Sequence, residues 1–351
     1  MRNFLFVCYE HQYKHFLSWH IDAINRLPNH NADYVLCDSS LGLSRSGVRD
    51  SFSGIIALKK YLRDNIYDCV ISITPKAGLL VSISIAFSEV QQVHWFTGQV
   101  WANDRLVRRF LKRMPDFIIS VVASKLLCDS RPQREFLLAN GFNQFESKLE
   151  VPGAGSICGV DDSLFECATP IDASSTEVSV TFGVVGRINE EKGILWLLKA
   201  IEDRLNDQCK YKFVFIGTID GDKFCKKSFL KSVKLNNNIE FLGEISDKNK
   251  IYSSFDVLLC CSYREGFSNT IMEAQAFFKP VIVRDIYGVK STYIDGETGV
   301  CFETEDQLIE KLDLFSSHLE RHKFGEKGHK FAKDNFKRSR VIQNCLELYK
   351  Q

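Results

Sequence analysis

Short apolar runs alternate with helical patterns twice along this chain, and this alternation constrains the fold more than any other feature. In the first half, the apolar runs predict strands over Phe4–Val7, Tyr34–Leu36, Cys69–Ile73 and Val93–Phe96. The stretches between them predict helices over His15–Leu27, Gly54–Asp64 and Lys76–Ala86. Alternation of this kind is typical of a parallel sheet whose strands are connected by crossover helices.

A second alternation follows a polar, turn-rich stretch, Ala168–Thr176, which we interpret as a linker. Strands are predicted there over Val178–Val185, Tyr211–Ile216, Ile239–Leu242, Val257–Cys260 and Val281–Val283. Helices are predicted over Ile194–Leu205, Lys248–Ser253 and Thr270–Phe277. We therefore expect an α/β protein with two doubly wound parallel-sheet domains, residues 1–168 and 169–325. The remaining segment, residues 326–351, is helical in pattern and could pack on either domain, including back on the first.

The size and charge of the chain fit this expectation. Its 351 residues are enough for two domains of roughly 150–180 residues each. The 45 Lys and Arg residues balance 44 Asp and Glu residues, which leaves a net charge of +1 and no global electrostatic case for a nucleic-acid partner.

Targeting signals and a disulfide framework are not expected. No apolar run reaches the roughly 18–20 residues that a membrane-spanning helix needs, and the first residues resemble a strand, not a secretory signal. The twelve cysteines are scattered, without a Cys-x-x-Cys pair. We expect reduced thiols and a cytoplasmic protein.

Two cations follow the predicted strand Val178–Val185. Arg187 lies just past the strand, and Lys192 follows in the same loop. Ligands of open parallel sheets bind at the carboxyl ends of the strands, and two cations there suit an anionic ligand such as a diphosphate. The alternative is a solvated loop in which the cations pair with Glu190 or Glu191.

Two carboxylates lie around the start of the predicted helix Thr270–Phe277. Glu265 precedes the helix and Glu273 lies in its first turns. Gly266 permits a close backbone approach, and the amides of Ser268–Thr270 form a potential anion site at the helix start. The alternative for Glu273 is a capping box with Thr270, because the two residues have the required spacing.

His94 lies near the end of an apolar strand in the first domain. A lone histidine beside two tryptophans is commonly a packed or hydrogen-bonded core residue. Thr97 and Gly98 follow it and form a loop at the strand end, which favours a site there.

Several short motifs of the second half occur together in the order found in one enzyme family. They are Gly186-Arg187, Lys192-Gly193, Phe213–Gly217, Ile239–Gly243, Tyr252–Asp256, Ser262–Phe267, Glu273-Ala274, Lys279–Val281 and Asp295–Gly299. In this order they resemble the donor domain of retaining glycosyltransferases of the family-4 type, which have the GT-B fold. His94–Gly98 and Val151–Asp161 resemble the same family, particularly members that build bacterial surface polysaccharides.

The resemblance implies a role for each donor-side residue. Arg187 and Lys192 would hold the donor diphosphate. Glu265 would contact the donor sugar as a catalytic residue, and Glu273 would bind the ribose hydroxyls. The backbone amides of the segment between these carboxylates would meet the sugar and the phosphates. This segment comprises Gly266, Phe267, Ser268, Asn269 and Thr270.

For the first domain, the resemblance implies the acceptor side. His94 would face the reacting sugar as a second catalytic residue, and Thr97 and Gly98 would lie beside the acceptor. In this family the two domains face each other across a cleft.

The implied activity is retaining transfer of a sugar from a nucleotide-sugar to a glycan acceptor, in O-antigen or capsule synthesis. A UDP-sugar donor is favoured over a GDP-sugar, and neither a metal nor another cofactor is expected. The acceptor would be carried on a polyprenyl diphosphate at the inner face of the plasma membrane. The alternatives are a nucleotide-sugar 2-epimerase of the same architecture and a non-catalytic nucleotide-sugar-binding subunit.

An acidic pair, Asp220 and Asp222, also allows two interpretations. Asp220-Gly-Asp222 imitates the metal-binding Asp-x-Asp motif of a different glycosyltransferase fold. Glycine with two aspartates is also ordinary turn composition, and we favour an acidic turn without a metal.

Five basic residues form one stripe on a predicted helix in the first domain. They are Arg105, Arg108, Arg109, Lys112 and Arg113. Leu106, Val107, Phe110 and Leu111 are predicted to occupy the other side of the helix. The stripe could lie on an anionic membrane surface, which would make the protein peripheral to the membrane. The alternative is a solvated basic face on a helix that packs on the core.

Overall fold

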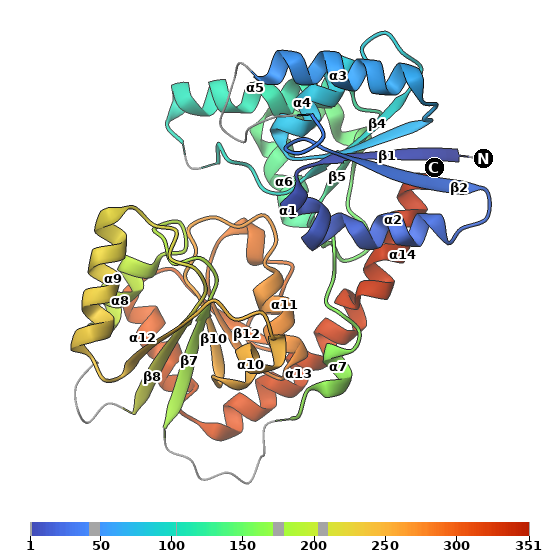
Figure 1. The fold of residues 1–351 in the computed structure, drawn as a ribbon. Helices are drawn as coiled ribbons and strands as arrows, with labels where there is room; N and C mark the ends of the chain where they lie inside the picture. Colours follow the sequence, from blue (N-terminus) through green and yellow to red (C-terminus); the bar gives the residue numbers. More distant parts are fainter. Residues whose placement is uncertain (1, 42–49, 103, 171–178, 203–209, 351) are drawn as a thin grey trace. The chain divides into compact units, whose positions relative to one another are not determined.

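The computed structural model describes residues 2–41, 50–102, 104–170, 179–202 and 210–350, which form two compact units (Figure 1). Unit 1 comprises Met1–Cys158 together with Ser339–Gln351, and unit 2 comprises Gly159–Arg338. The Ala168–Thr176 linker lies mostly outside the described residues.

Unit 1 is built on a six-stranded parallel sheet with the order β2-β1-β3-β4-β5-β6. Its strands are β1 (Arg2–Cys8), β2 (His30–Leu36), β3 (Cys69–Ile73), β4 (Gln91–Phe96), β5 (Lys125–Cys128) and β6 (Leu149–Glu150). The four strands predicted from the sequence are all present. The sequence analysis missed β5, which begins with a lysine, and β6, which has only two residues.

Helices cover both faces of this sheet. They are α1 (Glu10–Gln12), η1 (Tyr13–Leu17), α2 (Ser18–Asn25), α3 (Asp50–Asp64), α4 (Pro75–Ser84), α5 (Leu106–Val122), α6 (Arg131–Leu137), η2 (Leu138–Phe142), η3 (Asn143–Lys148) and α14 (Arg338–Lys350). Alternate residues of β1 face opposite ways: Phe4 and Phe6 join the core against α2 and α14, whereas Leu5 and Val7 join the core against α3 and α4. Burial on both faces explains the continuous apolar run that predicted this strand.

The last helix, α14, is part of the core of unit 1. The Tyr349 hydroxyl accepts a hydrogen bond from Trp95 Nε1 at 2.9 Å and lies 3.2 Å from His20 Nδ1. All three side chains are buried. The end of the chain therefore stabilises the unit in which the chain begins.

Unit 2 contains the second six-stranded parallel sheet, with the order β12-β11-β10-β7-β8-β9. Its strands are β7 (Val180–Val185), β8 (Tyr211–Ile216), β9 (Ile239–Gly243), β10 (Val257–Cys260), β11 (Val281–Arg284) and β12 (Gly299–Phe302). Its helices are α7 (Leu164–Cys167), α8 (Ile194–Ile201), α9 (Lys223–Leu235), α10 (Lys248–Ser253), α11 (Asn269–Ala276), η5 (Tyr287–Val289), α12 (Glu305–Leu314) and α13 (His318–Phe336). The sequence analysis did not predict α9 or β12.

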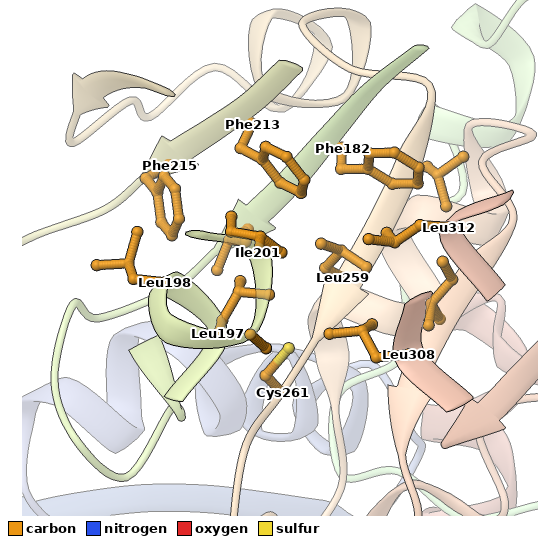
Figure 2. Close-up of a cluster of buried hydrophobic side chains, with 14 of the residues drawn as sticks. Phe182, Leu197, Leu198, Ile201, Phe213, Phe215, Leu259, Cys261, Leu308 and Leu312 are labelled. Carbon is orange, nitrogen blue, oxygen red and sulfur yellow. The ribbon is translucent and has the colours of Figure 1, made fainter. Parts of the chain in front are cut away.

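The core of unit 2 lies where α8 and α12 pack on this sheet. Figure 2 shows Phe182 and Phe213 of neighbouring strands beside leucines of both helices. The two phenylalanine rings are stacked, with centroids 5.5 Å apart. Fully buried aromatic side chains of this size contribute strongly to the stability of unit 2.

The boundary between the units lies earlier than residue 168, where the sequence analysis placed it. Two passages of the chain run side by side here, because Val160 N donates to Phe336 O and Arg338 N donates to Val160 O, both at 2.7 Å. Arg338 also pairs with Asp161 at 2.7 Å. These bonds hold the residues after Cys158 in unit 2. The predicted C-terminal segment, residues 326–351, is divided between the units at Arg338.

The strand order of unit 2 reverses direction at β7. Its sequence successor β8 pairs on one side of β7, and β10 pairs on the other. Loops that leave the carboxyl ends of β7 and β10 therefore diverge to opposite faces of the sheet and leave a crevice between them, where open α/β sheets bind ligands.

The cysteines that the structure describes are free thiols. Within the same residues, no helix is both long enough and apolar enough to cross a membrane.

Candidate functional site

A narrow pocket lies at the reversal point of the sheet in unit 2. It is lined by Val184, Val185, Gly186, Arg187, Lys192, Leu259, Cys260, Cys261, Ser262, Glu265 and Thr270. These residues follow β7 and β10 or belong to those strands, apart from Thr270 at the start of α11. The strand-end residues singled out in the sequence thus converge in space.

Lys192 and Glu265 form an ion pair in this pocket. Lys192 Nζ lies 2.5 Å from Glu265 Oε1, and Ser262 Oγ donates to the same oxygen at 2.7 Å. Both side chains of the pair are largely buried. Burial by itself lowers the pKa of Lys192, but the Glu265 carboxylate more than reverses this effect, so the pKa is raised. Lys192 is therefore a fixed positive charge at the strand ends.

Backbone packing brings these two side chains together. Gly193 has a φ of +70°, and a Cβ at this position would lie 2.2 Å from the carbonyl oxygen of Cys261. Only glycine permits both this conformation and this approach. A second contact joins the loop after β7 to the loop after β10: Arg264 donates to Glu191 Oε1 at 2.7 Å.

Arg187 is half-exposed at the mouth of the pocket. Its Nη1 donates to Asp220 Oδ2 at 2.7 Å, and its Nη2 lies 3.6 Å from Glu191 Oε2. The sequence analysis anticipated the Glu191 contact as an alternative and missed Asp220. Arg187 is thereby oriented while its guanidinium stays accessible to a ligand.

The acidic pair that imitates a metal motif has other partners in the structure. Asp220 pairs with Arg187, while Asp222 caps α9 by accepting a hydrogen bond from Cys225 N at 2.7 Å. Across the described ranges, no group of three or more His, Cys, Asp or Glu side chains is placed to hold a metal ion.

Glu273 lies on α11 and points to α10. Its Oε2 accepts hydrogen bonds from Lys248 Nζ at 2.7 Å and from the Tyr252 hydroxyl at 2.6 Å. The capping-box alternative was wrong: Ser268, not Thr270, is the N-cap of α11. Burial, followed by the Glu273 carboxylate, raises the pKa of Tyr252 well above its ordinary value. Tyr252 is therefore a permanent donor that fixes the carboxylate.

The residues around the start of α11, Gly266–Asn269, offer backbone amides to the candidate site more than they offer side chains. The Ser268 side chain is buried and lies 3.1 Å from Thr270 Oγ1, and among the described residues it makes no capping hydrogen bond to the helix. The Phe267 ring packs against Phe336 of α13. Gly266 and Asn269 are half-buried. The amides at the start of α11 therefore have no side-chain cap from Ser268.

Lys248, Tyr252 and Ser262 are the contacts that sequence reasoning missed. Tyr252 and Ser262 were quoted within family motifs, but no role was inferred for them. Lys248 and Tyr252 hold a carboxylate that is distant in sequence, and such pairings are visible only in the fold. Ser262 holds the carboxylate of Glu265, three residues further along the chain.

His94 is completely buried inside unit 1. Its Nδ1 lies 2.9 Å from Ser72 Oγ, and Gln92 Nε2 donates to the same hydroxyl at 3.0 Å. A Cβ on Gly78 of α4 would lie 2.5 Å from the His94 ring. Burial lowers the pKa of His94 to about 3, so the ring is neutral at physiological pH. Its environment is that of a core histidine, whereas Thr97 and Gly98 lie at the end of β4 and are half-buried.

The basic stripe on α5 is only partly available to a partner. Arg109 and Arg113 both donate to Asn140, the second of them to its carbonyl oxygen at 2.7 Å. Lys112 pairs with Asp104 at 2.7 Å. Val107, Phe110 and Leu111 lie opposite the basic residues, as predicted, but this side of the helix does not pack on the core. Val107, Phe110 and Leu111 are exposed, because α5 packs on its unit through the side that carries the basic residues; the side chain of Leu106 lies outside the described residues.

Comparison with known proteins gives this site a context. Residues 173–331 match the model of the family described as glycosyl transferases, group 1. The matched segment lies within unit 2. It contains every donor-side residue identified above.

Similar proteins include both sequences and solved structures. The capsular polysaccharide biosynthesis glycosyltransferase CapM of Staphylococcus aureus is 27% identical over 287 residues, which cover 78% of this chain and 74% of CapM. A glycosyltransferase structure from Rickettsia africae has a TM-score of 0.78 at 18% identity and covers 99% of this chain and 98% of that chain. The structure of Anabaena Alr3699/HepE in complex with UDP-glucose has a TM-score of 0.78 at 17% identity and covers both chains fully.

The chain is thus a glycosyltransferase, and its glycosyltransferase domain occupies unit 2. The expected fold class is confirmed: the protein is α/β, with two doubly wound parallel sheets and glycosyltransferase structures of the GT-B type as neighbours.

Proposed function

We propose that unit 2 binds a nucleoside diphosphate sugar at the ends of β7 and β10, and that the protein transfers the sugar to a glycan acceptor with retention of anomeric configuration. The observation that carries this proposal is the ion pair of Lys192 and Glu265, at the reversal point of the sheet and beside the start of α11. A fixed cation next to uncapped helix amides suits a diphosphate.

The chemistry follows from where charge develops. When the bond between the anomeric carbon and the diphosphate breaks, negative charge grows on the leaving diphosphate. Lys192, Arg187 and the amides at the start of α11 would stabilise this charge. The acceptor hydroxyl forms the new bond on the same face of an oxocarbenium-like centre, and its proton passes to the leaving diphosphate. The positive charge comes from side chains, so we propose that the reaction needs no metal.

The two carboxylates would recognise different parts of the donor. Glu265 lies in the pocket beside Lys192 and would accept hydrogen bonds from hydroxyls of the sugar. Glu273 is held by Tyr252 and Lys248 and would accept from the ribose hydroxyls.

The acceptor would bind at the sheet edge of unit 1, where Thr97 and Gly98 follow β4. His94 makes no substrate contact in this proposal, because its ring is wholly inside the unit. It supports the end of β4 from within, through its hydrogen bond to Ser72.

Two of the similar proteins support the substrate classes. The solved complex of Anabaena Alr3699/HepE contains UDP-glucose, which favours a UDP-sugar over a GDP-sugar as the donor here. CapM is named for capsular polysaccharide biosynthesis, which favours a surface polysaccharide, capsule or O-antigen, as the product here. We propose that this polysaccharide is built on a polyprenyl diphosphate.

The test is release of UDP from UDP-sugars in the presence of EDTA, with and without polyprenyl-diphosphate-linked acceptors. We expect release that depends on the acceptor, and a product whose anomeric configuration by NMR matches the donor. Conversion of the UDP-sugar to its 2-epimer without an acceptor and without net release of UDP would instead identify a 2-epimerase. Binding of UDP without turnover of any donor would identify a non-catalytic subunit.

A further inference from the structure

Helix α5 of unit 1 presents an apolar stripe away from its own unit. The stripe consists of Val107, Phe110, Leu111, Met114, Ile118, Val121 and Val122, whose exposed fractions range from 38% to 75%. At 3.6 residues per turn, these side chains fall within about 120° of the helix circumference, along a helix about 25 Å long. So wide and continuous an apolar face on a surface helix marks an interaction site.

The opposite side of α5 attaches the helix to unit 1. Asp116, Ile119 and Ser120 are buried there, and Asp116 Oδ2 accepts a hydrogen bond from Trp101 Nε1 at 2.7 Å. Gly78 of α4 lets the two helices approach closely, since a Cβ there would lie 2.7 Å from Ile119. α5 lies beside α4 on the outside of unit 1 (Figure 1). The exposure of the stripe is therefore a consequence of how the helix is anchored.

The charges around the stripe indicate the kind of partner. Arg105 and Arg108 are exposed where α5 begins, and Lys112 follows on the same flank, paired with Asp104. The helix itself contains a single acidic residue, Asp116, and this residue is buried. An apolar stripe flanked by cations, without exposed acids, complements a bilayer whose surface is anionic. A second copy would offer no acid from this helix to pair with these cations.

We propose that unit 1 binds the surface of an anionic lipid bilayer through α5, which lies parallel to the membrane with its apolar stripe among the lipids. This inference goes beyond the transfer reaction. It can be tested without donor or acceptor, so its failure and the failure of the proposed function are distinguishable.

The test is co-sedimentation of the full chain with vesicles of phosphatidylcholine, with and without phosphatidylglycerol. Wild type should bind only the vesicles that contain phosphatidylglycerol. The combined variant Val107→Ser, Phe110→Ser and Leu111→Ser should bind these vesicles at least about tenfold more weakly than wild type, because three apolar side chains no longer enter the bilayer. All three residues are exposed, so an unchanged melting temperature shows that the fold is intact.

The matched control replaces three exposed apolar residues of unit 2, Phe224, Leu235 and Leu319, by serine. Each is 67% exposed, and none lies on α5. This variant should bind vesicles like wild type. Arg105→Gln with Arg108→Gln should weaken binding about fivefold per cation and reduce its salt dependence.

Three results would overturn the proposal. Wild type could fail to bind the anionic vesicles, or the serine variant of α5 could bind them as well as its control. Light scattering could also show a wild-type dimer that becomes monomeric in that variant while vesicle binding stays unchanged, which would assign the stripe to contact between copies.

Discussion

At the scale of single residues, the site depends on charges that the fold holds in fixed pairs. Lys192 is the centre of this arrangement, because Glu265 keeps it charged despite its burial. We predict that Lys192→Met lowers kcat/KM for the donor about 100-fold or more, as expected when one group that stabilises the departing charge is lost. Lys231→Met, which changes an exposed lysine of α9, should have no effect. Equal activity of the two variants would exclude Lys192 from donor binding.

The proposed role of Glu273 predicts a change in affinity for the donor when this residue is replaced. Glu273→Gln keeps the shape of the side chain but weakens its acceptance of hydrogen bonds from Tyr252 and Lys248 and, in the proposed donor complex, from the ribose. We expect KM for the donor to rise about tenfold while kcat changes little. The matched control is Glu240→Gln on the exposed side of β9. A fall in kcat with KM unchanged would contradict a role in ribose binding.

The burial of His94 predicts how the free energy of unfolding depends on pH. Its pKa is lowered from 6.5 to about 3 by burial, so below pH 6.5 the unfolded chain takes up a proton that the folded chain does not. Stability conferred by this neutral ring is complete above pH 6.5 and falls as the pH falls. The loss attributable to His94 reaches about 1.4 kcal/mol at a pH one unit below 6.5.

The measurement is the free energy of unfolding of wild type and His94→Asn at a series of pH values. The variant should be less stable near neutral pH, but its stability should decline less steeply toward acid. Equal slopes of unfolding free energy against pH in wild type and variant would contradict the account. They would show that the histidine has the same pKa in the folded and the unfolded protein.

At the scale of single elements, glycine geometry in the loop after β7 can be tested directly. Gly193 and Gly296 have nearly the same φ, +70° and +72°, but a Cβ would meet the Cys261 carbonyl only at Gly193, while nothing lies within 4 Å at Gly296. Gly296→Ala should cost about 1 kcal/mol from backbone strain alone. Gly193→Ala should cost about 2–4 kcal/mol, because the clash adds to the strain.

Chemical denaturation of both variants gives the two free energies, and donor turnover gives a second readout. We expect Gly193→Ala to lose activity, since it separates Lys192 from Glu265, and Gly296→Ala to keep it. Equal destabilisation of the two variants would mean that the approach of the loop to Cys261 is not required.

The elements that the sequence predicted best are those whose pattern is set locally. Cys69–Ile73, Tyr211–Ile216 and Val257–Cys260 are strands with the predicted bounds, because parallel strands that are buried on both faces form mostly apolar runs. β12 was missed because it begins with a glycine and directly follows the turn-like sequence Asp295–Thr298. The two sides of α5 were predicted, but not which side packs on the unit, because an amphipathic pattern does not say which side meets the protein.

Part of the candidate site could also be predicted from the sequence. Arg187, Lys192 and Glu265 could be found because strand ends of a parallel sheet converge wherever the topology reverses. The contacts of Glu273 could not, because Lys248 and Tyr252 lie on a different helix whose position depends on tertiary packing.

At the scale of the whole molecule, the C-terminal helix stabilises the N-terminal unit. Tyr349 is buried against Trp95 and His20 in the core of unit 1. Tyr349→Ala should destabilise this unit by about 3–5 kcal/mol. Hydrogen exchange should accelerate in β1, β3 and β4 but not in β7 and β10. Leu319→Ala, which changes an exposed residue of α13, is the control and should leave both units unchanged.

The central claim is that the strand ends of unit 2 bind the donor diphosphate through side-chain cations. The most direct measurement is a thermal-shift titration with UDP and with GDP, each with and without EDTA, on wild type and Lys192→Met. A ligand that binds only the folded state raises its melting temperature. We predict that UDP raises the melting temperature of wild type with or without EDTA, and that Lys192→Met loses most of this rise. No shift with either nucleotide, a shift abolished by EDTA, or an equal shift in the variant would contradict the account.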